Sequence, residues 1–245
     1  MTGHAPEGVE LLRYAAFTKD GTGGNPAGVV LDAGGLSEVR RLALAAEVGY
    51  SETAFLEQGS HDDEHRIRFY SPRAEVTFCG HATIVAAVAL AERGGAGTVT
   101  FETLAGRIEV RTVEEPAGFT ATFTSAPTHS RPATEDEVHT ALHALRWDSS
   151  DLDRRYPAHV AYAGAEHLIL AVHDRERLAH LDYDFAELDE IMAQRRWTTL
   201  QLVHAHDRAL FSSRNPFPPG GVVEDPATGA AAAAFGGYLL ALGAV

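Results

Sequence analysis

Two short polar segments, each followed by an apolar run, contain the residue types best suited to chemistry. Residues 78–83 read FCGHAT and offer a thiol and an imidazole, whereas residues 224–229 read EDPATG and offer two carboxylates and a hydroxyl. The runs that follow are rich in Ala and predict buried helices. Because the first backbone N–H groups of a helix have no intrahelical partner, each start is a ready anion site. The spacing therefore predicts a small carboxylate bound between two similar lobes.

The elements around these segments follow the same order in both halves of the chain. Strand-like runs lead to an apolar helix at about 81–93 in the first half and about 229–242 in the second. A helix that is apolar on all sides is one enclosed by other elements. The segment EEPAG at 114–118 favours a linker, since proline and glycine interrupt strand pairing. We therefore predict an N-terminal lobe at 1–115 and a C-terminal lobe at 118–245.

Composition excludes several classes of protein. The chain has 245 residues, 45% of them hydrophobic, and a formal charge of −14, which disfavours nucleic acid and anionic lipid as partners. Cys79 is the single cysteine, so no intramolecular disulfide can form and a reducing cytoplasm is expected. The apolar C-terminal run is shorter than the roughly 20 residues that span a membrane, which predicts a buried helix and no membrane partner.

Several motifs fail on closer reading. The Gly-rich run at 21–26 has Pro26 where a dinucleotide fingerprint needs its third glycine, and a strand follows it. The sequence GYSET at 49–53 lacks the closing glycine of a nucleophile elbow, so Ser51 is interpreted as a strand-edge residue. The pairs His139/His143 and His204/His206 have workable ligand spacings without an evident third ligand. We therefore predict no metal and no other cofactor.

Spacing alone also allows a role without function in catalysis or binding for each of the strongest candidates. Glu52 could be a surface carboxylate, Asp225 could start a turn or cap a helix, and His81 could be a helix residue satisfied by a carbonyl.

Five short motifs occur together in one order. They are GNPAGVV at 24–30, SETAF at 51–55, RFYSP at 68–72, FCGHAT at 78–83 and EDPATG at 224–229. In this combination the chain resembles the PhzF-like family of phenazine biosynthesis, which shares the diaminopimelate epimerase fold. The resemblance covers most of the chain.

The resemblance implies an α+β fold of two similar lobes, each a curved, mostly antiparallel sheet wrapped around a central apolar helix. It also implies an active site in the cleft between the lobes. Relatives usually continue past the second helix with further strands, so the C-terminal lobe of this chain is expected to lack them. A homodimer that covers this lobe is therefore expected.

The resemblance also implies roles for individual residues. Glu52 is expected to be the acid/base that takes a proton from carbon and returns it elsewhere on the substrate, which favours a pKa raised towards neutrality. Asp225 and His81 are expected to bind and polarise the substrate. The residues expected to contact the substrate are Asn25, Tyr70, Gly80, Gly229 and Ala230. Ala230 stands where family members commonly have serine, so a different substrate is expected.

The single cysteine decides between reactions of this fold, because its racemases use two thiols. The expected function is a cofactor-independent isomerase that moves a proton between carbons of a small cyclic or conjugated carboxylic acid, in amino-acid-derived or secondary metabolism. The alternatives are a one-base epimerase, a hydrolase of C–C or C–N bonds on the same site, or a non-catalytic small-acid binding protein.

Overall fold

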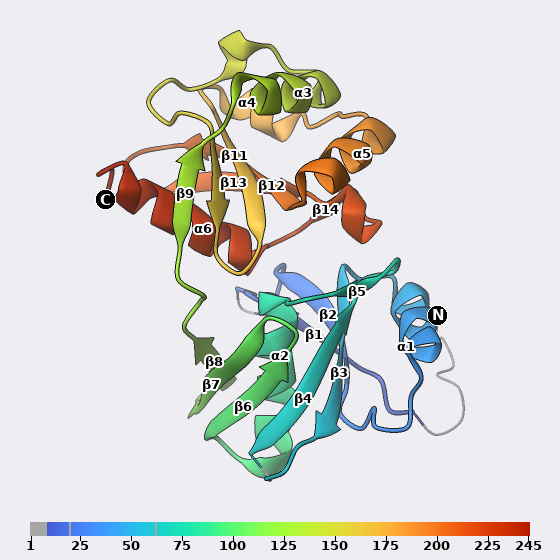
Figure 1. The fold of residues 1–245 in the computed structure, drawn as a ribbon. Helices are drawn as coiled ribbons and strands as arrows, with labels where there is room; N and C mark the ends of the chain where they lie inside the picture. The colour runs from blue at the N-terminus through green and yellow to red at the C-terminus, as the bar shows by residue number, and fades with distance from the viewer. Residues whose placement is uncertain (1–8, 20, 62) are drawn as a thin grey trace. The chain divides into compact units, whose positions relative to one another are not determined.

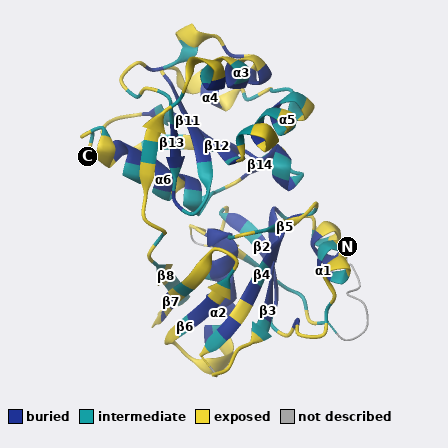
Figure 2. Cartoon of the chain, viewed as in Figure 1, coloured by how far each residue is buried: buried dark blue, intermediate teal, exposed yellow. Residues whose placement is uncertain are grey.

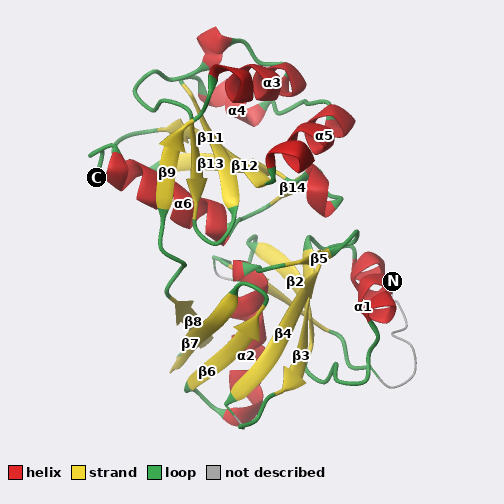
Figure 3. Ribbon diagram, viewed as in Figure 1, coloured by secondary structure: helices red, strands yellow, loops and turns green. Residues whose placement is uncertain are grey.

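The structure is a computed structural model, and it describes residues 9–19, 21–61 and 63–245. Residues 1–8 of the predicted N-terminal lobe lie outside the described residues. The chain divides into two compact units, the first ending at Thr124 and the second running from Ser125 to Val245. Each unit combines a sheet with helices (Figures 1 and 3).

The first unit is built on a sheet whose strands lie in the order β1-β2-β3-β4-β6-β7-β8, with β5 paired to β4. The β2/β3 and β4/β6 pairs are parallel and the other pairs are antiparallel. The strands are β1 (Leu12–Ala16), β2 (Asn25–Val30), β3 (Glu52–Gln58), β4 (Glu64–Tyr70), β5 (Glu75–Val76), β6 (Thr98–Thr103), β7 (Gly106–Glu115) and β8 (Gly118–Phe123). The helices are α1 (Glu38–Val48) and α2 (Gly80–Gly94).

Helix α2 is the centre of this unit. It packs against both edge strands, β1 and β8, and against β2, β3 and β7 between them, so the sheet curls around the helix. Most of its residues are buried (Figure 2). Alternation along the strands separates two cores: Ala54 and Leu56 pack with α2, whereas Phe55 and Tyr70 pack with α1 on the opposite face.

The second unit has a six-stranded sheet in the order β14-β13-β12-β11-β10-β9. The β11/β12 pair is parallel and the others are antiparallel. The strands are β9 (His129–Pro132), β10 (His159–Tyr162), β11 (Glu166–Val172), β12 (Trp197–Ala205), β13 (Phe211–Pro216) and β14 (Glu224–Asp225). The helices are α3 (Glu135–Leu145), α4 (Arg175–Ala179), α5 (Phe185–Arg195) and α6 (Gly229–Ala241), with 3-10 turns at Ser149–Asp151 and Pro218–Gly220.

Helices cover both faces of this sheet. Leu168 and Leu170 of β11 pack with α3 and α5, whereas Ile169 and Ala171 point to the other face and pack with α6. Helix α6 lies against β9, β10, β11 and β12. The predicted architecture of two lobes, each with a mostly antiparallel sheet around an apolar helix, is confirmed.

The segment at 114–118 is not a linker between the lobes. It forms the turn of a β-hairpin, in which Glu115 of β7 faces Gly118 of β8. Strand β8, at the start of the predicted C-terminal lobe, therefore belongs to the first sheet and not to the second lobe. Its antiparallel register with β7 decides this, and the local pattern of proline and glycine fits a hairpin turn as well as a linker.

Among the described residues, no helix is both long and apolar enough to cross a membrane.

Candidate active site

A group of polar side chains of the first lobe lies at the N-terminal end of α2. Asn25 is the first residue of β2 and Glu52 the first residue of β3. These strands are parallel neighbours with Ala27 opposite Glu52, so their first residues lie at the same end of the sheet. Cys79 is the N-cap of α2 and His81 is its second residue. The side chains of Asn25 and Glu52 share the face of the sheet that packs on α2.

The imidazole of His81 is the centre of this group. Its Nδ1 lies 3.1 Å from Asn25 Nδ2 and 3.2 Å from Cys79 Sγ. Its Nε2 lies 3.5 Å from Glu52 Oε2 and 3.4 Å from Ser51 Oγ. With the Asn25 amide oriented as in the structure, its N–H donates to Nδ1, which must then accept. A neutral His81 therefore carries its proton on Nε2, which faces the carboxylate of Glu52.

The group is shielded from solvent. The relative solvent exposure of Glu52 is 5% and that of His81 is 1%. Charges and hydrogen bonds act more strongly in such a low-dielectric environment than in water. A surface role for Glu52 is therefore wrong, and His81 is engaged by side chains of three different segments.

The two central helices differ from the others at their N-termini. The N-cap side chains of α1, α3, α4 and α5 all accept a hydrogen bond from the first turn of their helix. The N-cap residues of α2 and α6, Cys79 and Thr228, make no such side-chain bond. The Cys79 thiol contacts His81 instead, and the Thr228 hydroxyl donates to Asp225 Oδ2 at 2.5 Å. Backbone N–H groups at such helix starts suit an anion.

The second lobe places Asp225 at the start of α6. Asp225 is 4% exposed and ends the short strand β14. Its neighbour Glu224 forms an ion pair instead, in which both of its carboxylate oxygens accept hydrogen bonds from Arg214 at 2.7 and 2.8 Å. Of the two carboxylates in the EDPATG segment, Asp225 is thus the one held with the N-cap residue of the helix.

A row of buried polar side chains crosses the second sheet and ends at Asp225. His167 Nδ1 of β11 lies 2.9 Å from Thr199 Oγ1 of β12, and Asn215 of β13 donates to Gln201 Oε1 of β12 at 2.5 Å. Asn215 is opposite Asp225 in the ladder. We call these five residues the second-lobe polar row. Its members are at most 4% exposed.

Burial is the main influence on the pKa of His167 in this row. It lowers the pKa of His167 to about 4, against a small opposing influence of Thr199 and of the negative charge of Asp225. His167 is therefore neutral at neutral pH. Among the described residues its Nε2 has no hydrogen-bond partner.

Of the residues predicted to contact the substrate, three begin the central helices and Tyr70 lies elsewhere. Gly80 begins α2 beside Cys79, and Gly229 and Ala230 begin α6. Tyr70 lies on the opposite face of the first sheet from Glu52, where its ring meets that of Phe55 edge-on at 5.5 Å in the α1 core. It is not part of the polar group, because its register in β4 pairs it with Thr53 and not with Glu52.

Sequence reasoning missed four contributors. Ser51, interpreted as a strand-edge residue, contacts His81 and Asn25. His167, Thr199 and Gln201 were not singled out. Alternating polar residues within the apolar strand at 197–205 were the available signal, since a buried strand rarely carries them without a partner.

One group of side chains could hold a metal ion. Donor atoms of Glu52, Cys79 and His81 lie within 4.8 Å of one another, and all three residues are buried. The pairs His139/His143 and His204/His206 belong to no group of three such donors among the described residues.

Comparison with known proteins identifies the family. The family model "Phenazine biosynthesis-like protein" matches residues 14–245. "Uncharacterized isomerase YfhB" of Bacillus subtilis is 30% identical over 238 residues, which cover 94% of this chain and 80% of that protein. A crystal structure of the PhzF-family phenazine biosynthesis protein of Bacillus anthracis superposes with a TM-score of 0.78 at 26% identity, covering 94% of this chain and 80% of that chain.

A more distant likeness concerns the fold alone. A hydroxyproline epimerase from Agrobacterium vitis, solved with bound trans-4-OH-L-proline, has a TM-score of 0.62 at 14% identity and covers 91% of this chain and 75% of that chain. The chain has the diaminopimelate epimerase-like fold that these proteins share.

The chain belongs to the phenazine biosynthesis-like family. It is an enzyme of the isomerase class, which is the designation of several of its relatives.

Proposed function

We propose that this protein isomerises a small carboxylic acid by moving a proton between two of its carbon atoms, with Glu52 as the acid/base. The observation that supports this most directly is the buried Glu52 carboxylate, 3.5 Å from His81 Nε2 at the start of α2. A buried carboxylate next to a neutral hydrogen-bond donor is suited to accept a proton from a weak carbon acid and return it.

The proposed step conserves protons. The Glu52 carboxylate takes the proton from one carbon, leaving a delocalised anion, and the neutral Glu52 acid then gives it to a second carbon on the same face. The double bond shifts and Glu52 regains its starting charge. The Nε2–H of His81 steadies the carboxylate before transfer, and the backbone N–H groups at the start of α2 favour the anionic intermediate.

Asp225 is proposed to bind and polarise the substrate. Its carboxylate accepts a hydrogen bond from the hydroxyl of Thr228. In this role Asp225 accepts a hydrogen bond from a polar group of the substrate and so orients it.

The cysteine count supports a mechanism with one acid/base. A two-thiol racemisation needs a thiol on each face of the stereocentre, and Cys79 is the single cysteine of the chain. Proton return to the same face then favours a double-bond shift over inversion.

Deuterium uptake tests the proposal. A panel of small cyclic and conjugated carboxylic acids is incubated in D2O with the wild type, with Glu52→Gln and with Glu102→Gln, in which an exposed carboxylate of the same lobe is changed. Uptake of deuterium with the wild type and Glu102→Gln but not with Glu52→Gln is expected. Uptake that Glu52→Gln leaves unchanged would remove Glu52 from the mechanism.

The products separate the remaining alternatives. Unchanged mass with a moved double bond supports the proposal, inverted chirality would indicate one-base epimerisation, and a change of mass would indicate bond cleavage. Stabilisation by acids without turnover across the panel would indicate a binding protein. A cytoplasmic homodimer and a role in secondary metabolism stay predictions, and sedimentation at micromolar concentration tests the dimer.

A further inference from the structure

We propose that Glu52, Cys79 and His81 form a binding site for a borderline-soft divalent cation such as Zn²⁺ or Co²⁺, and that the bound cation inhibits the enzyme. These residues supply one oxygen, one sulfur and one nitrogen donor. Thiolate, imidazole and carboxylate are the ligands that zinc takes in proteins, whereas the sulfur disfavours Mg²⁺ and Ca²⁺.

The distances between the donors fit one ion. His81 Nε2 lies 3.5 Å from Glu52 Oε2 and 4.0 Å from Cys79 Sγ. Tetrahedral ligands at zinc bond lengths of about 2.0–2.3 Å are about 3.3–3.6 Å apart, so the nitrogen–oxygen pair already has the required separation. Cys79 Sγ lies nearer Nδ1, at 3.2 Å, so the Cys79 side chain has to rotate towards Nε2 to complete the site.

The backbone that carries the three ligands is preformed. Glu52 is fixed at the start of a central strand, and Cys79 and His81 are fixed at the start of a buried helix. Each is less than one-tenth exposed. An ion that binds there needs little ordering of the protein, and the formal charge of −14 attracts cations to the chain.

Binding changes the protonation of the ligands. The Cys79 thiol releases its proton to solvent when its sulfur binds the ion. The proton on His81 moves from Nε2 to Nδ1, and the Asn25 amide turns over so that its Oδ1 accepts from Nδ1. Glu52 donates a lone pair to the ion and can no longer take a proton from carbon. The inhibitory part of the proposal therefore rests on the proposed role of Glu52, whereas the binding part stands on the geometry alone.

Cobalt binding tests the site directly. Co²⁺ is titrated into the purified full chain under a non-chelating reductant, and the near-ultraviolet thiolate-to-cobalt charge-transfer band is recorded. Because Cys79 is the single cysteine, any such band reports on this site. One equivalent is expected to saturate the band, and Zn²⁺ is expected to displace Co²⁺.

Variants separate a built site from a lone thiol. Cys79→Ser should abolish the band, while His81→Asn and Glu52→Gln, which keep the thiol, should each weaken Co²⁺ binding at least tenfold. His204→Asn removes a histidine of a pair that offers no thiol and should leave the titration unchanged. Circular dichroism checks the folding of each variant. No band, or a band that His81→Asn and Glu52→Gln leave unchanged, overturns the proposal.

Activity gives a separate outcome. Zn²⁺ should slow the deuterium exchange of the wild type, and a chelator should restore it. A cobalt band together with no exchange for any acid would keep the metal site and reject the proposed reaction. Exchange that saturating Zn²⁺ leaves unchanged would overturn the inhibition.

Discussion

The starts of α2 and α6 are built alike but differ in chemistry. At both, the N-cap side chain contacts a reactive group instead of capping the helix: Cys79 contacts His81, and Thr228 contacts Asp225. At α2 the carboxylate of Glu52 meets an imidazole that can exchange protons. At α6 the carboxylate of Asp225 lies at the end of a polar row fixed to three strands of the sheet.

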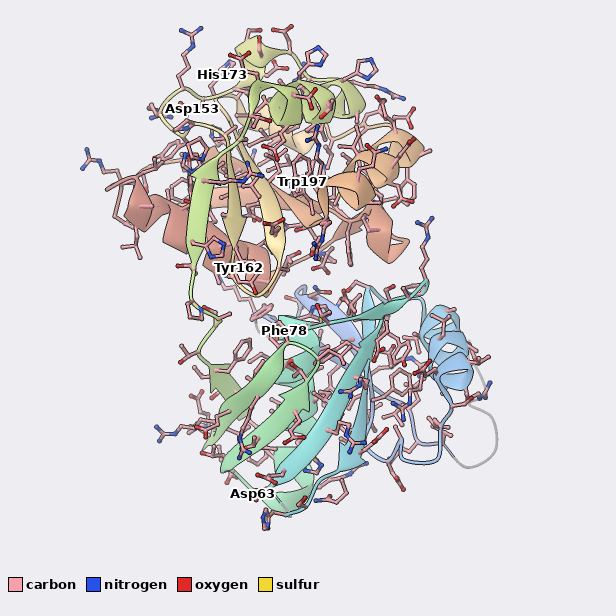
Figure 4. The ribbon with its side chains drawn as sticks, viewed as in Figure 1. Asp63, Phe78, Asp153, Tyr162, His173 and Trp197 are labelled. Atoms are coloured by element: carbon pink, nitrogen blue, oxygen red, sulfur yellow. The ribbon has the colours of Figure 1, made fainter. Side chains whose placement is uncertain are left out.

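The difference fits the separate roles that we propose for Glu52 at the start of α2 and Asp225 before α6. The proposed acid/base role of Glu52 needs a partner that adapts to its change of charge, and His81 Nε2 lies 3.5 Å from Glu52 Oε2 for that purpose. The proposed role of Asp225 is substrate binding, which needs a side chain held in place, and its carboxylate accepts a hydrogen bond from Thr228. Phe78 lies immediately before the start of α2 (Figure 4). Its ring meets those of Phe69 and Phe123 edge-on in the apolar core of the first lobe.

Glu52→Gln should have the largest effect on activity. It removes the proton acceptor but keeps the size of the side chain and one acceptor oxygen, so the isomerisation rate should fall about 10²- to 10⁴-fold. Rates of product formation by NMR measure it, with Glu102→Gln as the matched control. A loss below tenfold would reverse the assignment of Glu52 as the acid/base.

Asp225→Asn should cost less, because it changes binding and polarisation and not the proton carrier. We expect about a 10- to 100-fold loss in kcat/KM, corresponding to one charge-assisted hydrogen bond of about 1.5–3 kcal/mol. Asp182→Asn, at an exposed aspartate paired with Arg146, should have little effect. Combining Glu52→Gln with Asp225→Asn should give a non-additive loss if both act on one substrate.

His167 should make the second lobe sensitive to acid. Its pKa is lowered to about 4 in the folded chain from an ordinary value of 6.5, so the unfolded chain binds the proton more readily between these pH values. Stability should therefore fall as the pH drops from about 6.5 to about 4, by about 3 kcal/mol in all. Urea unfolding at several pH values measures this.

His167→Gln provides the control for the acid sensitivity. The difference between the wild-type and His167→Gln stability curves should be flat above pH 6.5 and change only below it. A constant difference across the whole range would show that His167 titrates alike in the folded and unfolded chains.

Ala230→Ser should have the smallest effect. It restores the hydroxyl that the PhzF-like resemblance leads one to expect at the start of α6, and one net hydrogen bond of about 0.5–1.5 kcal/mol should lower KM roughly two- to tenfold for an acid that can use it. Ala232→Ser, an exposed position of the same helix, is the control. An equal change in both variants would indicate an effect on the helix and not on the substrate.

Local patterns were enough for much of the fold. The Ala-rich runs predicted both central helices, which the structure places at Gly80–Gly94 and Gly229–Ala241. The short strands β9 and β10 are beyond local patterns, because four residues carry too little alternation to be distinguished from a loop.

The sequence by itself determined the family, through five ordered motifs, and limited the chemistry to one thiol through its cysteine count. Only the tertiary structure decided which polar residues meet. Asn25 and His81 are 56 residues apart and touch, whereas Tyr70 lies on the face of the sheet away from Glu52. The physical reason is that strand register and the alternation of faces are set by long-range pairing, which no local pattern contains.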